Sequence, residues 1–174
     1  STVNTQSTLA GGSNALTITG AADIDGAFTG ITALSVSGTS NIGANVTTSG
    51  TQSYSGAVTV SAASTLSTTN SDVTLGGTLT LADNLTITTG AGAGDIAVTG
   101  SIDGAKALSL SAGTGAITLN GAVGQTTRLG ALTLNSSGTT TLTQSVKAAS
   151  VTSNADGTLR ITDRLKDVIK SGGE

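Results

Sequence analysis

Short triplets in which apolar and hydroxyl residues alternate recur along the whole chain. Six of them are Leu16-Thr17-Ile18, Leu34-Ser35-Val36, Val58-Thr59-Val60, Leu79-Thr80-Leu81, Leu108-Ser109-Leu110 and Leu132-Thr133-Leu134. Successive side chains of a β-strand point to opposite sides, so each triplet predicts a short strand with one buried side. Similar triplets such as Val73-Thr74-Leu75 lie between these six, and turn-forming pairs such as Asn120-Gly121 separate them.

The spacing of the six triplets predicts a repeat. They begin at positions 16, 34, 58, 79, 108 and 132, so the steps between them are unequal and their period lies in the low twenties. Such a period, with no helical periodicity before residue 160, is typical of a parallel β-solenoid. We therefore predict an all-β parallel β-solenoid of about six coils, with Leu, Ile and Val inward and Thr and Ser outward. The alternative is an antiparallel sandwich, although sandwiches usually have large aromatic residues in the core.

Charged residues divide the chain into two parts. Residues 1–105 contain six acidic residues, all Asp, but no Lys or Arg. Residues 156–174 carry eight of the 17 charged residues of the chain. So abrupt a change in composition indicates a boundary near Asn154. We predict a solenoid repeat domain over residues 1–154 and a short charged C-terminal cap segment over residues 155–174.

Composition argues against several classes of function. His, Cys, Met, Trp and Pro are absent, and Phe28 and Tyr54 are the two aromatic residues. Without His and Cys, the usual nucleophile–base pairs and soft-metal sites cannot form. The net charge of −3 and the lack of basic clusters argue against binding to nucleic acid or to an anionic membrane surface. We expect a chain that is not an enzyme, with no catalytic, cofactor-binding or metal-binding residue, no cofactor and no membrane insertion.

Two acidic motifs could in principle bind a cation. Asp23 and Asp25 flank Ile24 as a carboxylate pair would, but Asp25-Gly26-Ala27 recurs as Asp103-Gly104-Ala105, which favours a turn whose Asp bonds its own backbone. The segment Gly90-Ala91-Gly92-Ala93-Gly94-Asp95 is similar to a Ca²⁺-binding nonapeptide, yet it occurs once and has Ala where that repeat needs Gly. A loop of small residues is expected there.

The outward hydroxyl groups suggest a second kind of function. Regularly spaced Thr and Ser could order water as an ice-binding array, but the unequal steps between the triplets favour ordinary solvated strand faces. Three glycosylation sequons begin at Asn45, Asn84 and Asn135, and chance supplies several in a chain so rich in Thr and Ser.

The body of the chain, about residues 10–150, resembles a known family. The segments 48–59 (TSGTQSYSGAVT) and 129–135 (LGALTLN) look like repeats of filamentous-haemagglutinin-like and autotransporter-like bacterial adhesins. The resemblance implies a right-handed β-helical shaft that is extracellular or on the outer cell surface. Because Ser1 is not preceded by an initiator Met or a leader, we expect an interior piece of a longer protein. The expected function is a structural, non-catalytic shaft, and possible partners are a second copy, end to end, or a surface glycan. The alternatives are a Thr-rich binding face for ice or glycan, or a non-functional fusion.

The fusion alternative comes from residues 156–174. They resemble the segment that opens the small C-terminal domain of AMP-forming fatty-acyl-CoA synthetases. The resemblance implies a hairpin in which Arg164 contacts the nucleotide ribose and Gly172-Gly173 approaches the active site. Asn154 stands where that family usually carries a hinge carboxylate, and the chain ends at Glu174, before the rest of that domain.

We expect residues 155–174 to act as a physical cap. Leu159 and Ile161 would point inward and continue the stack, and Val168 and Ile169 would fold over the open core. Because an uncovered solenoid end invites association, deleting residues 155–174 should raise oligomerisation without abolishing strand content. Sedimentation and circular dichroism measure both. A truncated chain that stays as monomeric as the whole chain and melts at the same temperature would contradict the cap.

Overall fold

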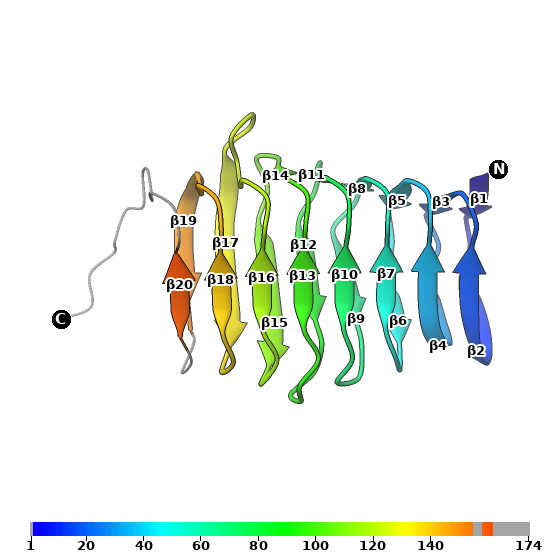
Figure 1. Ribbon diagram of the computed structural model, residues 1–174. Coiled ribbons are helices and arrows are strands. Elements are labelled where there is room, and N and C mark those ends of the chain that lie inside the picture. The colour runs from blue at the N-terminus through cyan, green and yellow to red at the C-terminus, as the bar shows by residue number, and fades with distance from the viewer. Residues whose placement is uncertain (1, 155–157, 162–174) are drawn as a thin grey trace.

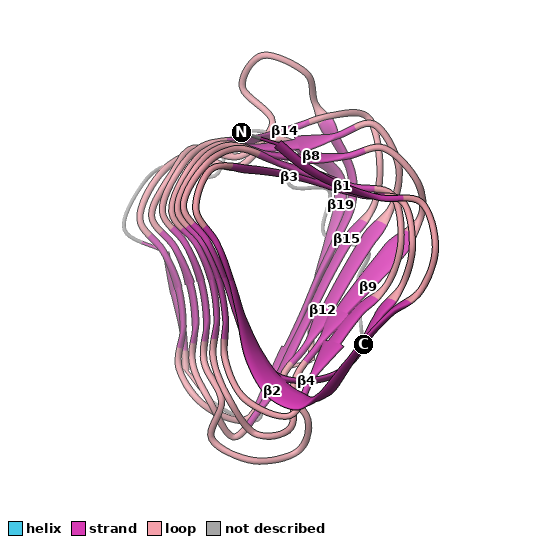
Figure 2. Ribbon diagram, turned by 90° about the vertical axis from the view of Figure 1, so that its right-hand side faces the viewer, coloured by secondary structure: helices cyan, strands magenta, loops and turns pink. Residues whose placement is uncertain are grey.

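The chain winds into a solenoid with three faces. The computed structural model describes residues 2–154 and 158–161, and these form an all-β parallel β-solenoid of about seven turns with no helix (Figure 1). Viewed along its axis, the solenoid has a roughly triangular cross-section (Figure 2). We name its sides face A, face B and face C, in the order in which each turn visits them. The turns are right-handed (Figure 1), so the predicted fold class is confirmed.

Each face is a ladder of parallel strands. Face A contains β1 (Thr2–Thr5), β3 (Ala21–Ile24), β5 (Ser40–Ile42), β8 (Val58–Val60), β11 (Leu79–Leu81) and β14 (Ile102–Asp103), and bridges at Val123 and Val146 continue it. Face B contains β6 (Val46–Thr48), β9 (Ser64–Ser67), β12 (Leu85–Thr88), β15 (Leu108–Gly113), β17 (Leu129–Ser136) and β19 (Ala148–Ser153). Face C contains β7 (Gln52–Tyr54), β10 (Val73–Leu75), β13 (Ile96–Val98), β16 (Ile117–Leu119), β18 (Thr140–Leu142) and β20 (Leu159–Ile161). Two long strands, β2 (Leu9–Ile18) and β4 (Phe28–Val36), bend from face B into face C.

The strand register corrects the predicted number of coils. The six triplets come from all three faces: Leu16 pairs with Leu34 on face C, Val58 with Leu79 on face A, and Leu108 with Leu132 on face B. Each of these pairs is separated by one coil, whereas the other two steps in the series join triplets on different faces. The structure therefore has about seven turns instead of about six. Triplets on different faces have the same local pattern, which is why their spacing alone miscounted the turns.

One apolar core runs along the solenoid axis. Inward rows of aliphatic side chains stack coil upon coil, as in the face A row Leu79, Ile102, Val123 and Val146. All four are at most 1% exposed, and burying such a side chain contributes roughly 1.5–3 kcal/mol. The prediction that Leu, Ile and Val point inward is confirmed.

The prediction that Thr and Ser point outward is wrong at several positions. The buried polar residues are Ser40, Thr48, Gln52, Ser64, Thr68, Thr89, Ser136 and Thr140. Four of them lie at the corner between faces B and C, where the chain turns away from the ladder. There Thr48 donates a hydrogen bond to the Gly50 carbonyl at 2.6 Å, and Thr89 donates one to the Gly94 carbonyl at 2.7 Å. Thr68 and Ser136 make similar bonds, to Ser71 and Gly115. A buried hydroxyl thus supplies the partner that a corner carbonyl needs.

A buried polar network crosses the third turn. Gln52 stands in the face C row between Leu34 and Val73, and its Nε2 donates to the Val46 carbonyl at 3.1 Å and the Ser67 carbonyl at 2.9 Å. The Tyr54 hydroxyl donates to Gln52 Oε1 at 3.1 Å. Because Val46 and Ser67 belong to face B, Gln52 connects two faces through the interior.

Burial of Tyr54 predicts a loss of stability at high pH. Tyr54 is 0% exposed, and desolvation raises the pKa of its hydroxyl above the ordinary value of 10.0. In the unfolded chain the hydroxyl ionises near that ordinary value while the folded state keeps it neutral. The contribution of Tyr54 is therefore intact below about pH 10 and falls above it, by up to about 1.4 kcal/mol per pH unit. Denaturant titrations from neutral to alkaline pH measure this loss. Tyr54→Phe, which cannot ionise, should show a shallower decline, and equal declines in both proteins would contradict the prediction.

Part of the expected cap segment extends the solenoid. Strand β20 pairs in parallel with β18, with Leu159 beside Thr140 and Ile161 beside Leu142. Arg160 is exposed, as predicted. The pairing of β20 confirms that residues 159–161 continue the stack, whereas the predicted inward direction of Leu159 and Ile161 lies outside what the structure describes. Other positions of that segment lie outside the described residues, namely Thr162, Arg164, Val168, Ile169, Gly172 and Gly173.

Candidate binding surface

Two rows of short polar side chains follow the outer side of face B. One row is Thr65, Thr86, Ser109, Thr133 and Thr152, and the other is Thr47, Ser67, Thr88, Ser111 and Asn135. Neighbours in a row are about 4.8 Å apart, and the two rows are roughly 7 Å apart because they are two residues apart along each strand. Ser67 donates a hydrogen bond to Thr47 at 3.1 Å, so adjacent coils are also joined on the outside.

This arrangement corrects the expectation that the outward hydroxyl groups are irregular. The coil that leads from Leu110 to Leu134 is longer than the one that leads from Val46 to Leu66, yet both pairs of residues are in register across face B. The extra residues lie at the corners, and the strands keep their register. The ladder from β15 to β17 has one irregularity, between Ser111 and Gly113.

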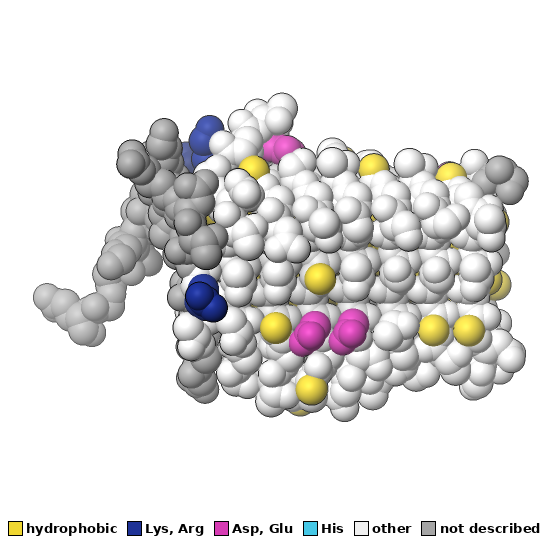
Figure 3. Space-filling model, in the orientation of Figure 1, with side chains coloured by type: hydrophobic (Ala, Val, Ile, Leu, Met, Phe, Trp, Pro, Cys, Tyr) yellow, Lys and Arg dark blue, Asp and Glu magenta, His cyan; other side chains and the backbone are white. Residues whose placement is uncertain are grey.

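Face C presents a largely uncharged surface. Its central outward row is Thr17, Ser35, Ser53, Thr74, Ala97, Thr118, Thr141 and Arg160. In Figure 3 this side is mostly white, with two neighbouring acidic side chains and a basic one toward the C-terminal end. Such a surface offers hydroxyl groups at regular intervals and little long-range field to attract a charged ligand.

Asp23 lies within an amide ladder on face A. Its Oδ2 accepts a hydrogen bond from Asn4 Nδ2 and its Oδ1 accepts one from Asn41 Nδ2, both at 2.7 Å. Asp25 follows β3 and is exposed. Within residues 2–154 and 158–161, no group of three or more His, Cys, Asp or Glu could hold a metal ion. Because both oxygens of Asp23 already accept hydrogen bonds from neighbouring coils, its evident role is to join the coils.

The expected bond of Asp103 to its own turn is wrong. Asp103 Oδ1 accepts hydrogen bonds from the backbone N–H groups of Thr126 at 2.8 Å and Thr127 at 3.1 Å, in the next coil. Asp72 bonds the N–H of Asp95 in the same way, at 2.9 Å. In a solenoid the segment about one coil further along lies directly beside the turn, so its N–H groups are within reach. The alternation of side chains does not predict this role, but the spacing of Asp72 and Asp95, one coil apart, is a signal for it.

Two of the sequon asparagines take part in the same kind of bond. Asn45 Oδ1 accepts a hydrogen bond from the N–H of Thr65 at 2.8 Å, and Asn84 Oδ1 accepts one from the N–H of Ala107 at 2.9 Å. All three sequon asparagines are exposed. Their amide groups therefore have structural partners in the folded chain.

The glycine-rich segment 90–95 forms a corner loop, as predicted. The Gly92 N–H donates to Asn70 Oδ1 at 2.7 Å, so the loop is held against the preceding coil. A Cβ on Gly94 would lie 2.6 Å from the nitrogen of Ser71. Small residues are needed here because the loop stacks closely on another loop.

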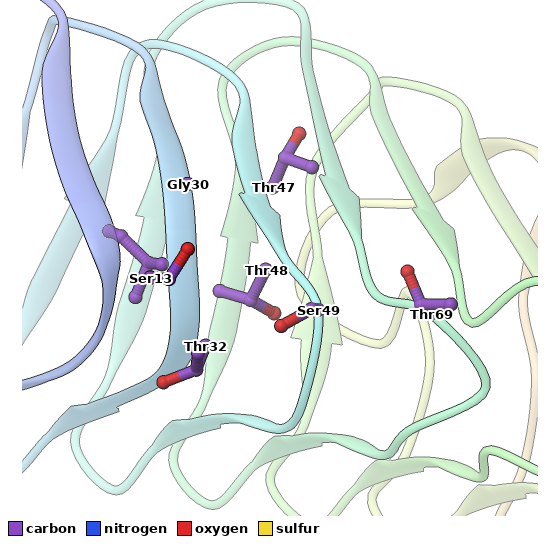
Figure 4. A pocket seen from close by; sticks show the side chains of 8 residues that line it. Ser13, Gly30, Thr32, Thr47, Thr48, Ser49 and Thr69 are labelled. Atoms are coloured by element: carbon purple, nitrogen blue, oxygen red, sulfur yellow. The ribbon is translucent and has the colours of Figure 1, made fainter.

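A shallow groove lies at the corner of faces B and C near the N-terminal coils. It is lined by Ser13, Gly30, Ile31, Thr32, Thr47, Thr48, Ser49 and Thr69, and most of these are hydroxyl residues (Figure 4). Its lining contains no charged or aromatic side chain. The groove could offer hydrogen bonds to a neutral, hydroxylated molecule, and its lining holds no His, Lys, Asp or Glu beside these hydroxyl groups.

Two further findings bear on function. None of the described segments forms a helix long and apolar enough to cross a membrane. Comparison of the chain with protein-family models, with curated proteins and with solved structures finds no match.

Proposed function

We propose that this chain is a non-catalytic structural shaft of a secreted or surface-exposed bacterial adhesin, which holds a binding part elsewhere in a longer protein away from the cell. The observation that carries the proposal is the uninterrupted stack of coils around one core. Each coil bonds to the next on three faces, so bending the rod would break several ladders at once. About seven coils at 4.8 Å give a rod of roughly 34 Å.

The surface supports the same function. The outward positions carry mostly short polar side chains. Water can satisfy their hydrogen-bonding groups, so a long rod of such coils stays solvated without a partner that covers it. The resemblance of segments 48–59 and 129–135 to adhesin repeats agrees with an extracellular rod of this kind.

A spacer experiment tests the proposal. The chain is placed between an outer-membrane anchor and a reporter epitope, in one copy and in two tandem copies, and compared with Gly/Ser linkers of equal residue number. A shaft should raise the epitope by the length of the rod for each copy, whereas flexible linkers should give a broader and shorter distribution. Fluorescence quenching from the membrane surface measures the height. Equal distributions for the rod and the linker would contradict a shaft.

The face B rows favour a second candidate, a binding surface for ice or for a regular glycan. The rows are more regular than the sequence suggested, because five consecutive coils keep them in register. Thermal hysteresis, or binding to a glycan array, by the purified chain would support this candidate if Thr86→Lys on face B removes it and Thr59→Lys on face A does not. Turnover in an ATP–pyrophosphate exchange assay would instead favour a remnant of an acyl-CoA synthetase.

A further inference from the structure

Asn120 differs from the other asparagines that the structure describes. Most of their side chains make hydrogen bonds within the chain, namely those of Asn4, Asn14, Asn41, Asn45, Asn70, Asn84 and Asn135. The exposed side chains of Asn120 and Asn154 make none with residues 2–154 or 158–161. Of these two, Asn120 is the one that precedes a glycine, Gly121, at the corner between faces C and A. Its amide is therefore free to turn toward the backbone nitrogen that follows it.

The backbone nitrogen of Gly121 is free as well. In the two Asp-Gly pairs of the described chain, the glycine nitrogen is engaged: the N–H of Gly26 donates a hydrogen bond to the Thr5 carbonyl at 2.7 Å. The N–H of Gly104 donates one to the Thr127 carbonyl at 3.3 Å. The N–H of Gly121 donates none to the described residues. Because glycine has no Cβ, no side chain of its own shields this nitrogen either.

We propose that Asn120 is a site of spontaneous covalent modification in the folded chain. Solvent base removes the proton from the Gly121 nitrogen, which then attacks Asn120 Cγ. The new C–N bond closes a cyclic imide, the bond from Cγ to Nδ2 breaks, and Nδ2 takes up a proton from solvent and leaves as ammonia. Water opens the imide at either carbonyl and gives aspartate or isoaspartate, in which the main chain passes through the side-chain carbons. The reaction needs no reactant besides water, and it does not depend on the shaft function above.

The two products differ in their effect on the fold. The corner that follows Leu119 spans three residues before the bridge at Val123, and the corner between β10 and β11 has the same length. Isoaspartate adds one main-chain atom to this corner. The backbone of Gly121 already lies so close to that of Gly100 that even a Cβ would not fit there. We therefore expect the isoaspartate form to lose stability at this corner and the aspartate form to keep the fold.

Incubation of the full chain followed by peptide mapping tests the site. Trypsin cleavage after Lys106 and Arg128 releases residues 107–128, in which Asn120 is the only asparagine. Mass spectrometry should show that this peptide changes from amide to acid and splits into aspartate and isoaspartate forms, faster as the pH rises from neutral to alkaline. Asn84, whose amide is hydrogen-bonded, should stay intact over the same time. An Asn120 that changes no faster than Asn84 in the folded chain overturns the proposal.

Two substitutions at equivalent corners test the role of the free N–H, and both positions are exposed. Thr99→Asn places an asparagine before Gly100, whose N–H donates no hydrogen bond to the described residues. Ser37→Asn places one before Gly38, whose N–H donates to the Gly20 carbonyl at 2.8 Å. Thr99→Asn should react at a rate similar to that of the natural site, and Ser37→Asn roughly two- to tenfold more slowly, the factor that one hydrogen bond gives. Equal rates in the two variants would overturn the role assigned to the free N–H.

Asn120→Ser tests the effect on the fold. Serine precedes the corner glycine at Ser37 and Ser55, so this variant should fold like the natural chain, and it cannot form the imide. After alkaline incubation and return to neutral pH, the natural chain should contain a fraction that melts at lower temperature, in proportion to its isoaspartate content. Circular dichroism should show no such fraction in Asn120→Ser. A natural chain rich in isoaspartate that melts like the fresh protein would contradict the loss of stability.

Discussion

Replacing Gly77 with Val should lower the free energy of unfolding by about 3 kcal/mol or more, because a side chain there would collide with backbone. Gly77 belongs to a column of glycines at the corner between faces C and A. The members that contact one another are Gly38, Gly56, Gly77, Gly100 and Gly121, and a Cβ on any of them would lie 2.1–2.5 Å from backbone of the glycine one coil earlier. Backbone cannot move aside without opening the ladders on both adjoining faces.

The neighbouring glycine provides the control. A Cβ on Gly76 would lie 3.1 Å from its nearest atom, the Ser55 carbonyl oxygen, and Gly76 is exposed. Gly76→Val should therefore cost clearly less than Gly77→Val, and urea titration followed by circular dichroism compares them. If the two variants lose the same stability, a general cost of valine at a turn explains the result and the close approach does not.

The fold class was predictable because the alternation is local. In a triplet such as Val58-Thr59-Val60, the two apolar residues indicate which side of the strand is buried. In the structure Val58 and Val60 are buried and Thr59 is exposed. The number of turns was not predictable in this way, because a triplet does not show on which face it lies. The buried Thr48 and Thr89 escaped prediction for a similar reason. These two residues are buried because their hydroxyl groups donate hydrogen bonds to corner carbonyls. The alternation of apolar and polar residues does not indicate where such carbonyls lie.

The surface was less predictable than the core, for a physical reason. Turn rules assign the side chain of Asp103 to nearby backbone, but in a solenoid the N–H groups that reach it are those of Thr126 and Thr127, 23 and 24 residues away. The same geometry aligns the face B rows even though the coils differ in length. Residues one coil apart are neighbours in space. Which side chains bond to each other or form a row on the surface can therefore be predicted only when the strand register is known.

Replacing Gln52 with Ala should lower the free energy of unfolding by about 3–5 kcal/mol, since it removes several buried hydrogen bonds at once and creates a cavity. The Gln52 side chain is 1% exposed. Its amide nitrogen donates hydrogen bonds to the carbonyls of Val46 and Ser67, and its amide oxygen accepts one from the Tyr54 hydroxyl. Ser53→Ala changes the adjacent outward position and should alter stability by less than about 0.5 kcal/mol. Urea titration of the three proteins measures both effects.

Gln52→Leu separates the cavity from the hydrogen bonds. Leucine nearly fills the space between Leu34 and Val73, yet the Val46 and Ser67 carbonyls and the Tyr54 hydroxyl would still lose their hydrogen bonds to Gln52. We therefore expect Gln52→Leu to lie between wild type and Gln52→Ala in stability. Adding Tyr54→Phe removes the orphaned hydroxyl, so the double variant should recover about 1 kcal/mol relative to the sum of the single losses. Additive losses would show that the Tyr54–Gln52 bond contributes nothing. A Gln52→Leu variant as stable as wild type would show that the amide does not stabilise this turn.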